Sequence, residues 1–426
     1  MLIKNFQELN LSSQRKIALE ALEKGLLALQ PESYLQRQIT IEDSLLKIQN
    51  SIYDLKSYKN VYLIGFGKGA SKVAKYLEDK LEQFLKEGYV IDLITQEFKK
   101  IEFTFGSHPL PSLDNLSFTQ KIIKRFENNL TEKDLVIVIT CGGGSAMLEL
   151  PAKIDLEKIK EINEELLKSG ANIYQMNTIR KHLSLVKGGG LAKILYPTKV
   201  ISLILSDVPG DDVGFVASGP TVQDETTLTD AIEIIKKFNL QEKIKIDWLI
   251  ETPKEDIYFK KIDYFVILSN KLALEEMKNY LENNGYFVEI LNYQLQGRVE
   301  EIAKDFFNLN NKKGVFLAGG ETTVEVKGQG KGGRNQELVL WFLKYLEENP
   351  RNGLFVSFNS DGYDNTEFGG AIGDLISLKK AKDLNLDLNE FLSNNDSFNF
   401  FKLIGDGIIT GRLESNVADL MILVNF

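Results

Sequence analysis

Short apolar runs that lead directly into glycine-containing turns constrain this chain more than any other feature. Five such turns follow runs with the character of buried strands: Gly65–Ser71, Cys141–Met147, Ser206–Val222, Gly319–Val326 and Asn359–Thr366. Amphipathic helical segments separate the runs, and this alternation predicts an α/β fold with a doubly wound, mostly parallel sheet. Such sheets bind ligands at the carboxyl ends of their strands, so the five turns are the first candidates for a functional site.

The composition limits the class of partner. A chain of 426 residues exceeds one ordinary hydrophobic core and predicts at least two domains. Its content of 43% hydrophobic and 26% charged residues is typical of a folded globular protein. The formal net charge of -9 argues against a nucleic-acid partner, although a local basic pocket could still bind a small anion.

The few cysteines and histidines limit the metal and redox chemistry. One cysteine and two histidines are present, which excludes an internal disulfide and makes a zinc site improbable. No apolar run is long enough for a membrane span and no signal peptide is evident, so we expect a cytoplasmic protein without a membrane partner. A homo-oligomer is compatible with the sequence.

The strand and helix pattern is weakest at about residues 239–261, and we place a domain boundary there. Residues 1–240 are predicted to form an N-terminal Rossmann-like domain. Residues 241–426 are predicted to form a smaller C-terminal α/β domain.

The first turn matches a dinucleotide-binding pattern. Gly65, Gly67 and Ala70 satisfy G-x-G-x-x-G/A, and Asp92 lies at about the spacing of a ribose-binding acid. This pattern favours a nicotinamide-dependent enzyme. Lys68, however, lies inside the turn, where an ammonium group suits a phosphate or a carboxylate; a solvated lysine in a structural turn is the alternative.

The second turn is a candidate anion cradle, because free N–H groups, a hydroxyl and the start of a helix converge there. Its residues are Gly142, Gly143, Gly144 and Ser145. Cys141 is interpreted as a small buried residue in preference to a nucleophile, since neither His108 nor His182 is demonstrably near it. His182 is interpreted as structural, whereas His108 could order its loop or contact a substrate.

The segment 314–338 combines a strand, a glycine-rich loop and a helix that begins near Arg334. Its glycines and cations could bind an anion, or the segment could be a surface hairpin. We expect four of its side chains to face the N-terminal domain: Glu321, Lys331, Arg334 and Asn335.

Two further segments carry charged side chains. Asp207 and Asp361 come directly after predicted strands, where carboxylates can hold Mg²⁺ or simply form turns. The segment 177–187 is predicted to be a helix capped by Asn177, with Arg180 among its cations. Those cations could form a solvated face or a clamp for a substrate carboxylate.

Taken in order, the motifs resemble the type 2 glycerate kinases (glycerate 2-kinases), whose C-terminal part is called the MOFRL domain. The motifs span nearly the whole chain: GFGKGA, SHPLP, GGGSAMLELP, MNTIRKHLSLVKGGGLA, LSDVPGDDVGFVASGPTV, GGETTVEVKGQGKGGRNQE, NDSFNFF and TGRLESNVADL. The resemblance implies transfer of the ATP γ-phosphoryl group to D-glycerate, giving 2-phosphoglycerate and ADP. It also implies a divalent cation such as Mg²⁺, an active site between the two domains and a MOFRL-like region at about 312–420.

The resemblance and the strand-end positions together give the expected roles. Lys68 and Arg334 match residues proposed for the family's active site, and Asp207 and Asp361 are expected to serve the metal or the attacking hydroxyl. Phosphate or nucleotide contacts are expected from Gly142, Gly143, Gly144, Ser145, Gly319, Gly320, Glu321, Lys331 and Asn335. The chain departs from the family pattern at Cys141, which is a harmless exchange of small residues. It also departs after Asp361-Gly362 and at Gly411–Asn416, and these two departures concern local loop shape and acceptor preference. The alternatives are an NAD(P)H-dependent hydroxypyruvate reductase and a non-catalytic binding protein for organic phosphates.

Overall fold

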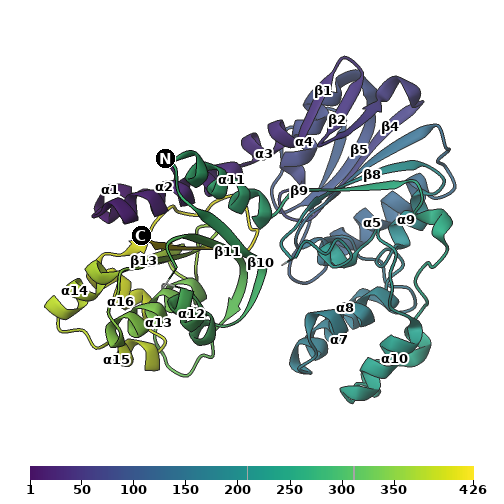
Figure 1. The fold of residues 1–426 in the computed structure, drawn as a ribbon. Coiled ribbons are helices and arrows are strands. Elements are labelled where there is room, and N and C mark those ends of the chain that lie inside the picture. Colours follow the sequence, from purple (N-terminus) through teal and green to yellow (C-terminus); the bar gives the residue numbers. More distant parts are fainter. Residues whose placement is uncertain (209, 310–311) are drawn as a thin grey trace. The chain divides into compact units, whose positions relative to one another are not determined.

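The computed structural model of the protein describes residues 1–208, 210–309 and 312–426. Contacts between Cα atoms divide the chain into two compact units, which we describe separately (Figure 1). The N-terminal unit consists of Leu35–Asp207 and Asp211–Ile267. The C-terminal unit consists chiefly of Met1–Tyr34 and Leu268–Phe426. Within the described residues, no helix has the length and apolarity needed to cross a membrane.

A six-stranded sheet forms the centre of the N-terminal unit. Its strands, in spatial order, are β6 (Ile101–Phe105), β5 (Leu85–Asp92), β4 (Asn60–Phe66), β7 (Asp134–Thr140), β8 (Lys199–Leu205) and β9 (Ile262–Leu268). The pairs from β6 to β8 are parallel. The order of strands reverses between β4 and β7, which is the topological switch point of a doubly wound sheet. The predicted fold class is therefore confirmed.

Helices cover both faces of this sheet because its central strands are apolar on both sides. Every residue of β7 is buried. Alternate residues of β4 face opposite ways, so Tyr62, Ile64 and Phe66 pack with Phe118 of α5 (Leu113–Phe126) and with α9 (Gly190–Leu195). Gly65 faces Ala70 of α4 (Ala70–Leu81) on the other side.

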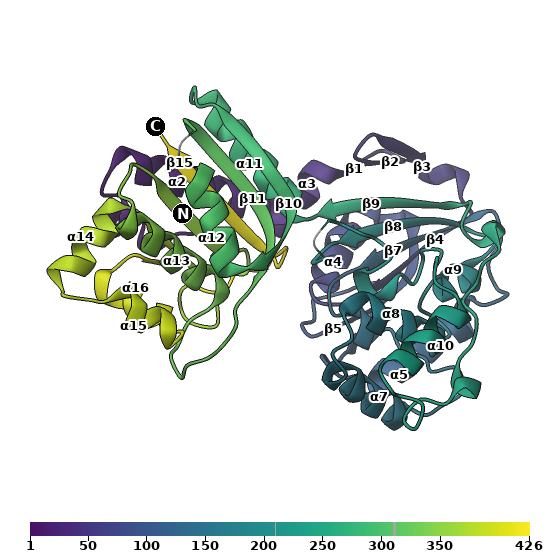
Figure 2. The same ribbon diagram turned by 60° about the horizontal axis from the view of Figure 1, so that its bottom comes forward.

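Two smaller assemblies complete the N-terminal unit. Three antiparallel strands, which the sequence pattern did not predict, are β1 (Ile39–Glu42), β2 (Leu45–Ile48) and β3 (Ser51–Asp54). Three helices share one apolar cluster and lie together in both views: α7 (Leu156–Lys168), α8 (Ile173–His182) and α10 (Leu228–Lys237) (Figure 2). Helix α8 begins earlier than predicted, because Asn172 and Gln175 form a capping box and the expected cap Asn177 lies buried inside the helix.

The C-terminal unit contains a mixed six-stranded sheet. Its strands, in spatial order, are β10 (Val288–Arg298), β11 (Gly314–Thr323), β15 (Asp419–Asn425), β12 (Leu354–Asn359), β13 (Gly370–Gly373) and β14 (Gly407–Ile408). Only β10 and β11 pair in parallel among the pairs of this sheet that the structure describes.

Helices also cover both faces of the second sheet (Figures 1 and 2). One layer surrounds a phenylalanine-rich core and comprises α12 (Val299–Leu309), α13 (Arg334–Glu348), α14 (Leu375–Asp383), α15 (Leu388–Ser393) and α16 (Ser397–Ile404). The other consists of α11 (Asn270–Asn283) and the N-terminal helix α2 (Ser13–Ala28), next to the short α1 (Phe6–Leu9). Helix α2 approaches α11 closely at Gly25, where an added Cβ would lie 2.7 Å from the sulfur of Met277 and would displace that side chain.

The units divide the chain at positions other than the predicted boundary between residues 240 and 241. Strand β9 was expected to open the second domain, but it lies beside β8 in the first sheet. Val200 N, in β8, donates to Lys261 O, just before β9, at 3.0 Å. Ile244 and Leu249 belong to the apolar cluster of α7, α8 and α10. The weakly patterned stretch therefore packs onto the N-terminal unit instead of linking two domains.

Candidate active site

The turns after β4 and β7 meet at the switch point of the N-terminal sheet. Lys68 N donates to Gly142 O at 2.9 Å. Gly67 has φ +103°, and a Cβ there would lie 2.5 Å from Cys141 O. Only glycine permits this approach of two backbones. The structure thus brings together the predicted Lys68 and the predicted Gly142–Ser145 turn.

The side chains of Lys68 and His108 meet beside the same turn. A Cβ on Gly143 would lie 3.1 Å from Lys68 Cε and 3.0 Å from His108 Cδ2. Burial, and then the charge of Lys68, lower the pKa of His108 below its usual value. The imidazole is therefore neutral near pH 7 and able to accept a proton. The sequence had left the role of His108 open, and the structure shows its ring beside Gly143.

Asp207 approaches the turn from the end of β8. A Cβ on Gly142 would lie 2.1 Å from Asp207 Oδ2, so the carboxylate lies directly against this glycine. Mg²⁺ is commonly held by one or two carboxylates together with substrate phosphates, and Asp207 fits that pattern. Over residues 1–208, 210–309 and 312–426, no three His, Cys, Asp or Glu side chains gather as a metal cage. Asp361 belongs to the C-terminal unit, so its predicted pairing with Asp207 on one metal stays a prediction.

Cys141 is fully buried beside the turn. Burial, together with the carboxylates of Asp92 and Asp207, raises the pKa of its thiol well above the usual value. A thiol held in its protonated form is a poor nucleophile. The environment therefore agrees with the interpretation of Cys141 as a small buried residue.

The carboxylate of Asp92, the last residue of β5, lies at the N-terminus of α4. Its Oδ2 accepts from Gly69 N at 3.1 Å, from Ser71 N at 3.0 Å and from Ser71 Oγ at 2.7 Å. In dinucleotide-binding folds the pyrophosphate takes these helix N–H groups and the acidic residue binds the ribose. Here the acidic residue takes the N–H groups itself, which removes both anchors expected for a nicotinamide cofactor.

Ser145 is held by a strained segment. Its Oγ lies 2.9 Å from the Oγ of Ser218, and Ser218 Oγ donates to Asn177 Oδ1 at 3.3 Å. Ala217 and Ser218 have φ values of +51° and +62°. Non-glycine residues adopt this region rarely and at a cost in free energy. A Cβ on Gly144 would lie 2.7 Å from Ala217 Cβ, so Gly144 allows the short helix α6 (Gly144–Met147) to pack on this segment.

In the C-terminal unit, Arg334 is held by two carboxylates. Its Nε donates to Asp419 Oδ2 at 2.7 Å, and its Nη1 donates to Glu321 Oε1 at 2.6 Å. Asp419 is fully buried, whereas Glu321 is exposed. Burial raises the pKa of Asp419 to about 6, and Arg334 offsets only part of this shift.

Asn335 is a buried link between two carboxylates. Its side-chain Nδ2 donates to Asp419 Oδ1 at 2.8 Å and to Asp364 Oδ1 at 3.3 Å. Asp364 also accepts from Asn335 N and Gln336 N, so it caps the start of α13 from a distant loop. Burial raises the pKa of Asp364 as well. The sequence analysis singled out Asp361 in this loop, whereas the structure shows that Asp364 caps the start of α13.

The glycine-rich loop of the segment 314–338 is bound to another part of its own unit. The backbone N–H groups of five successive residues, 327 to 331, donate to acceptors on Asn394, Asn395 and Asp396. These N–H groups are therefore not open to a phosphate in this structure. Gly319 and Gly320 lie within β11, where side chains would collide with Asn270 Nδ2 at 2.7 Å and Leu295 O at 2.0 Å. Packing alone thus explains why both are glycine.

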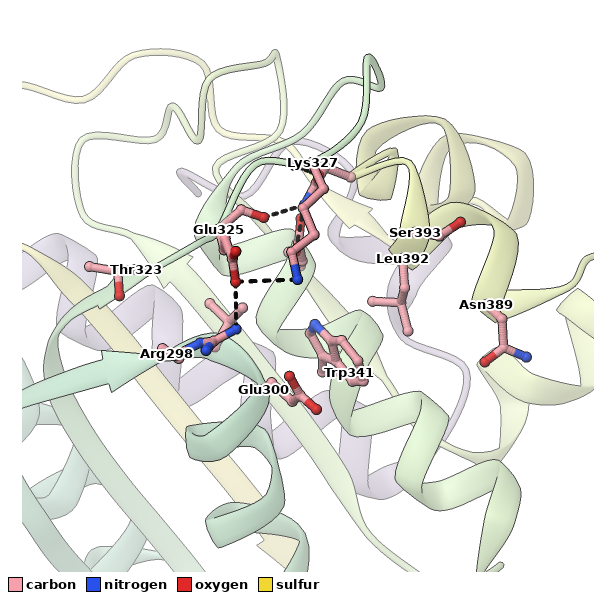
Figure 3. A pocket seen from close by; sticks show the side chains of 12 residues that line it. Arg298, Glu300, Thr323, Glu325, Lys327, Trp341, Asn389, Leu392 and Ser393 are labelled. Carbon is pink, nitrogen blue, oxygen red and sulfur yellow. Dashed lines mark hydrogen bonds and ion pairs between the residues drawn. The ribbon is translucent and has the colours of Figure 1, made fainter.

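Another cavity, of about 420 Å³, is lined by none of the predicted site residues (Figure 3). Its two cations already share one carboxylate: Arg298 Nη2 lies 2.7 Å and Lys327 Nζ 3.3 Å from Glu325 Oε2. Glu337, which also lines the cavity, accepts from Asn395 Nδ2 at 3.0 Å. Three acidic residues, Glu300, Glu325 and Glu337, line the cavity against two cations, so it is a weaker candidate for a phosphate than the switch point.

Comparisons with known proteins agree over nearly the whole chain. Residues 17–248 match a family described as a domain of unknown function (DUF4147), and residues 314–419 match the MOFRL family. A glycerate 2-kinase of Picrophilus torridus is 34% identical over 433 residues, covering 99% of each chain. The crystal structure of a glycerate kinase from Thermotoga maritima superimposes with a TM-score of 0.85 at 32% identity, covering 96% of this chain and 99% of that one. A protein of Agrobacterium vitis named as a putative hydroxypyruvate reductase is 34% identical over 84% of this chain and 85% of its own.

Proposed function

Because the chain belongs to the glycerate 2-kinase family with a C-terminal MOFRL domain, we propose that it transfers the γ-phosphoryl group of ATP to the 2-hydroxyl of D-glycerate. The products are 2-phosphoglycerate and ADP. The observation that carries this proposal is the position of Lys68, whose side chain lies beside the Gly142-Gly143 turn at the switch point.

Lys68 supplies the positive charge of this site. Catalysis of phosphoryl transfer mainly requires that the protein position the reactants and stabilise the charge on the transferring group. The ammonium group of Lys68 lies beside glycines whose backbone an anion can approach closely. We assign Lys68 to the transferring phosphoryl group, and Gly142, Gly143, Gly144 and Ser145 to the phosphates of the nucleotide.

Asp207 is the carboxylate of this unit that fits a divalent cation. Bound Mg²⁺ would neutralise phosphate charge during transfer. Asp207 lies against Gly142, so it would hold the cation next to the phosphates that the turn receives. We assign the neutral imidazole of His108 to accept the proton of the attacking hydroxyl.

Arg334 is the cation that we assign to the reaction in the C-terminal unit. Asp419 fixes its Nε side, while its Nη1 side pairs with the exposed Glu321. A phosphate could replace Glu321 at Nη1 without disturbing the buried pair. Asp361 as a metal ligand, and nucleotide contacts by Gly319, Gly320, Glu321, Lys331 and Asn335, stay predictions.

Incubation of the protein with ATP, Mg²⁺ and D-glycerate tests the proposal. We expect consumption of ATP and a product phosphorylated at carbon 2, identified by phosphorus–proton correlated NMR. Phosphorylation at carbon 3 would correct the regiochemistry and leave the kinase assignment in place. No ATP consumption together with NADH oxidation by hydroxypyruvate would overturn the assignment in favour of the reductase.

Two observations favour the reductase: the G-x-G-x-x-A pattern of the first turn and the putative reductase among the relatives. The position of Asp92 on the helix N–H groups opposes it. The third alternative, a non-catalytic binding protein, predicts that organic phosphates bind without turnover. Equilibrium binding of ATP, measured beside the activity, separates that alternative from the other two.

A further inference from the structure

A small cavity adjoins the point where Lys68, His108 and Gly143 meet. Its volume is about 250 Å³, and it belongs entirely to the N-terminal unit. The polar side chains that line it are those of His108, Ser145, Asn163 and Arg180. Pockets for drug-sized ligands span about 300–1,000 Å³, so this cavity suits a metabolite with few heavy atoms.

Arg180, in the last turn of α8, is an under-partnered cation in this cavity. Its Nε donates to Asn163 Oδ1 on α7 at 2.7 Å. Neither terminal nitrogen of its guanidinium has a hydrogen-bond or ion-pair partner among the residues that the structure describes. The side chain is half-buried, so water alone does not solvate it fully.

Two neighbouring cations of the same segment, unlike Arg180, each form an ion pair with a carboxylate. Lys181 Nζ lies 3.0 Å from Asp224 Oδ1, and Lys187 Nζ lies 2.5 Å from Glu149 Oε2. Both lysines are buried, and each has its own carboxylate. Arg180 has an amide in the place of a carboxylate, and it is the one of these three cations that lines the cavity.

The electrostatics of Arg180 agree with this geometry. Burial lowers its pKa, and the charge of Glu149 offsets only part of the shift. A guanidinium that has lost hydration without gaining a full counter-charge is stabilised by an incoming anion. Its two free terminal nitrogens offer a fork that matches a carboxylate in geometry.

We infer that Arg180 binds the carboxylate of the acceptor substrate through its two terminal nitrogens, with Asn163 holding the guanidinium in orientation. The inference rests on the proposed function and names the group that recognises the acid. With the carboxylate on Arg180, the hydroxyl-bearing carbons extend toward Ser145, His108 and Gly143, which also line the cavity. The acceptors that fit are therefore short 2-hydroxy acids, and uncharged analogues are rejected.

The first test is the variant Arg180→Gln, assayed with D-glycerate and with its neutral analogue D-glyceramide. Because Arg180→Gln loses the charge-assisted pair, we expect the KM for D-glycerate to rise by about 10- to 100-fold, which corresponds to about 1.4–2.8 kcal/mol of binding free energy in total. The KM for ATP should change by less than about twofold, and the preference for glycerate over glyceramide should collapse. The control Arg125→Gln removes an arginine of the same unit that pairs with Glu87 away from the cavity, and it should leave both KM values unchanged.

The second variant, Asn163→Asp, retains Arg180 and gives it an internal carboxylate partner. We expect the fold to be as stable as that of the parent, because a near-isosteric partner replaces the amide. The KM for D-glycerate should nevertheless rise, because the new carboxylate competes with the substrate for the guanidinium. A purely structural role of Arg180 predicts the opposite pattern, with unchanged KM values in this variant.

Titration calorimetry with D-glycerate separates failure of this inference from failure of the proposed function. A parent protein that phosphorylates D-glycerate, with an unchanged KM in both variants, would overturn the inference and leave the kinase standing. A parent protein that shows no transfer, but binds D-glycerate in a manner that Arg180→Gln abolishes, would overturn the proposed function and support the inference. Binding lost equally in Arg125→Gln would also overturn the inference.

Discussion

Arg334, the first residue of α13, and Asp419, the first residue of β15, form an ion pair at 2.7 Å in which the carboxylate is fully buried. Asp419 lies opposite Gly320 on one neighbouring strand and Asn359 on the other. The pair therefore ties the start of the helix to the middle of the sheet. It fixes the orientation of the guanidinium, and pre-oriented charges are the ones that stabilise a transition state most effectively, as the role that we propose for Arg334 requires.

Replacement of Arg334 by lysine should separate its charge from its geometry. A single ammonium group cannot reach both Asp419 and Glu321 as the planar guanidinium does, so we expect kcat to fall by about 100-fold in Arg334→Lys. Glu321→Gln removes only the exposed partner and should change the free energy of unfolding by less than about 1 kcal/mol. Steady-state kinetics and urea unfolding of both variants measure these effects. Full activity in Arg334→Lys would show that the fork geometry is irrelevant to the reaction.

Asp419 gives the protein a specific dependence of stability on pH. Its pKa is raised to about 6 in the folded chain, against roughly 3.9 in an unfolded one. Between these values the native state retains a proton that the unfolded state has lost. The contribution of Asp419 to the free energy of unfolding therefore falls as the pH rises from about 4 to about 6, and is constant above that window.

The variant Asp419→Asn lacks this titration and isolates it from that of the other carboxylates. We expect the free energy of unfolding of the parent, relative to that of the variant, to fall by on the order of 2–3 kcal/mol between pH 4 and pH 7. Urea unfolding at four pH values across the window provides the measurement. A difference that stays constant with pH would mean that Asp419 has an ordinary pKa in the folded protein.

The sequence predicted the strand-end turns and the helix starts, because these depend on residues that are adjacent in the chain. Lys68 and Gly142 each follow an apolar strand directly, and in a parallel sheet the ends of neighbouring strands meet. Their meeting is therefore a consequence of topology that the strand pattern already contains. The helix that starts at Arg334 was likewise predicted from the glycine-rich loop before it and from its amphipathic pattern.

Contacts between distant segments could not be predicted in this way. Nothing near the glycine-rich loop indicates that its N–H groups are taken by residues 394–396. Asp361 and Asp364 share one turn-forming segment, and only the three-dimensional path of that turn decides which reaches Asn335. The role of Asp92 was similarly hidden, because a carboxylate at a strand end can bind a ribose or cap a helix, and the sequence motif is the same.

Gly67 and Gly69 offer a matched test of the contact between the two turns. Both have positive φ values, +103° and +90°, which cost an alanine about 1–2 kcal/mol. A Cβ on Gly67 would also collide with the backbone of Cys141, whereas one on Gly69 meets nothing within 4 Å. We expect Gly67→Ala to lower the free energy of unfolding by about 1–3 kcal/mol more than Gly69→Ala.

The same pair should differ more in catalysis than in stability. The collision in Gly67→Ala pushes the Gly142 turn away from Lys68, so kcat should fall steeply, while Gly69→Ala leaves the contact in place. Urea unfolding and steady-state kinetics of the two variants provide the comparison. Equal losses in both variants would show that only the backbone angle matters at these positions and that the turns do not need to touch.

Arg15 attaches the N-terminal helix to the C-terminal unit. Its guanidinium is fully buried and donates to Asp374 and Asp406, each at 2.8 Å. Removing one partner of a buried ion pair typically costs about 3–5 kcal/mol. Asp406 keeps an ion pair with Lys380 at 2.7 Å, and Asp374 still caps α14, so we expect the lower end of that range for Arg15→Met.

The neighbouring residue provides the control for this prediction. Lys16 is exposed and lies 3.9 Å from Glu20, so Lys16→Met should change the free energy of unfolding by no more than about 0.5 kcal/mol. Hydrogen exchange should localise the effect of Arg15→Met to α2 and α14, which the guanidinium joins, and leave the strands of the N-terminal unit protected. If exchange instead accelerates in β4 and β7, the first 34 residues stabilise the N-terminal unit, and the division of the chain by contacts does not describe how it unfolds.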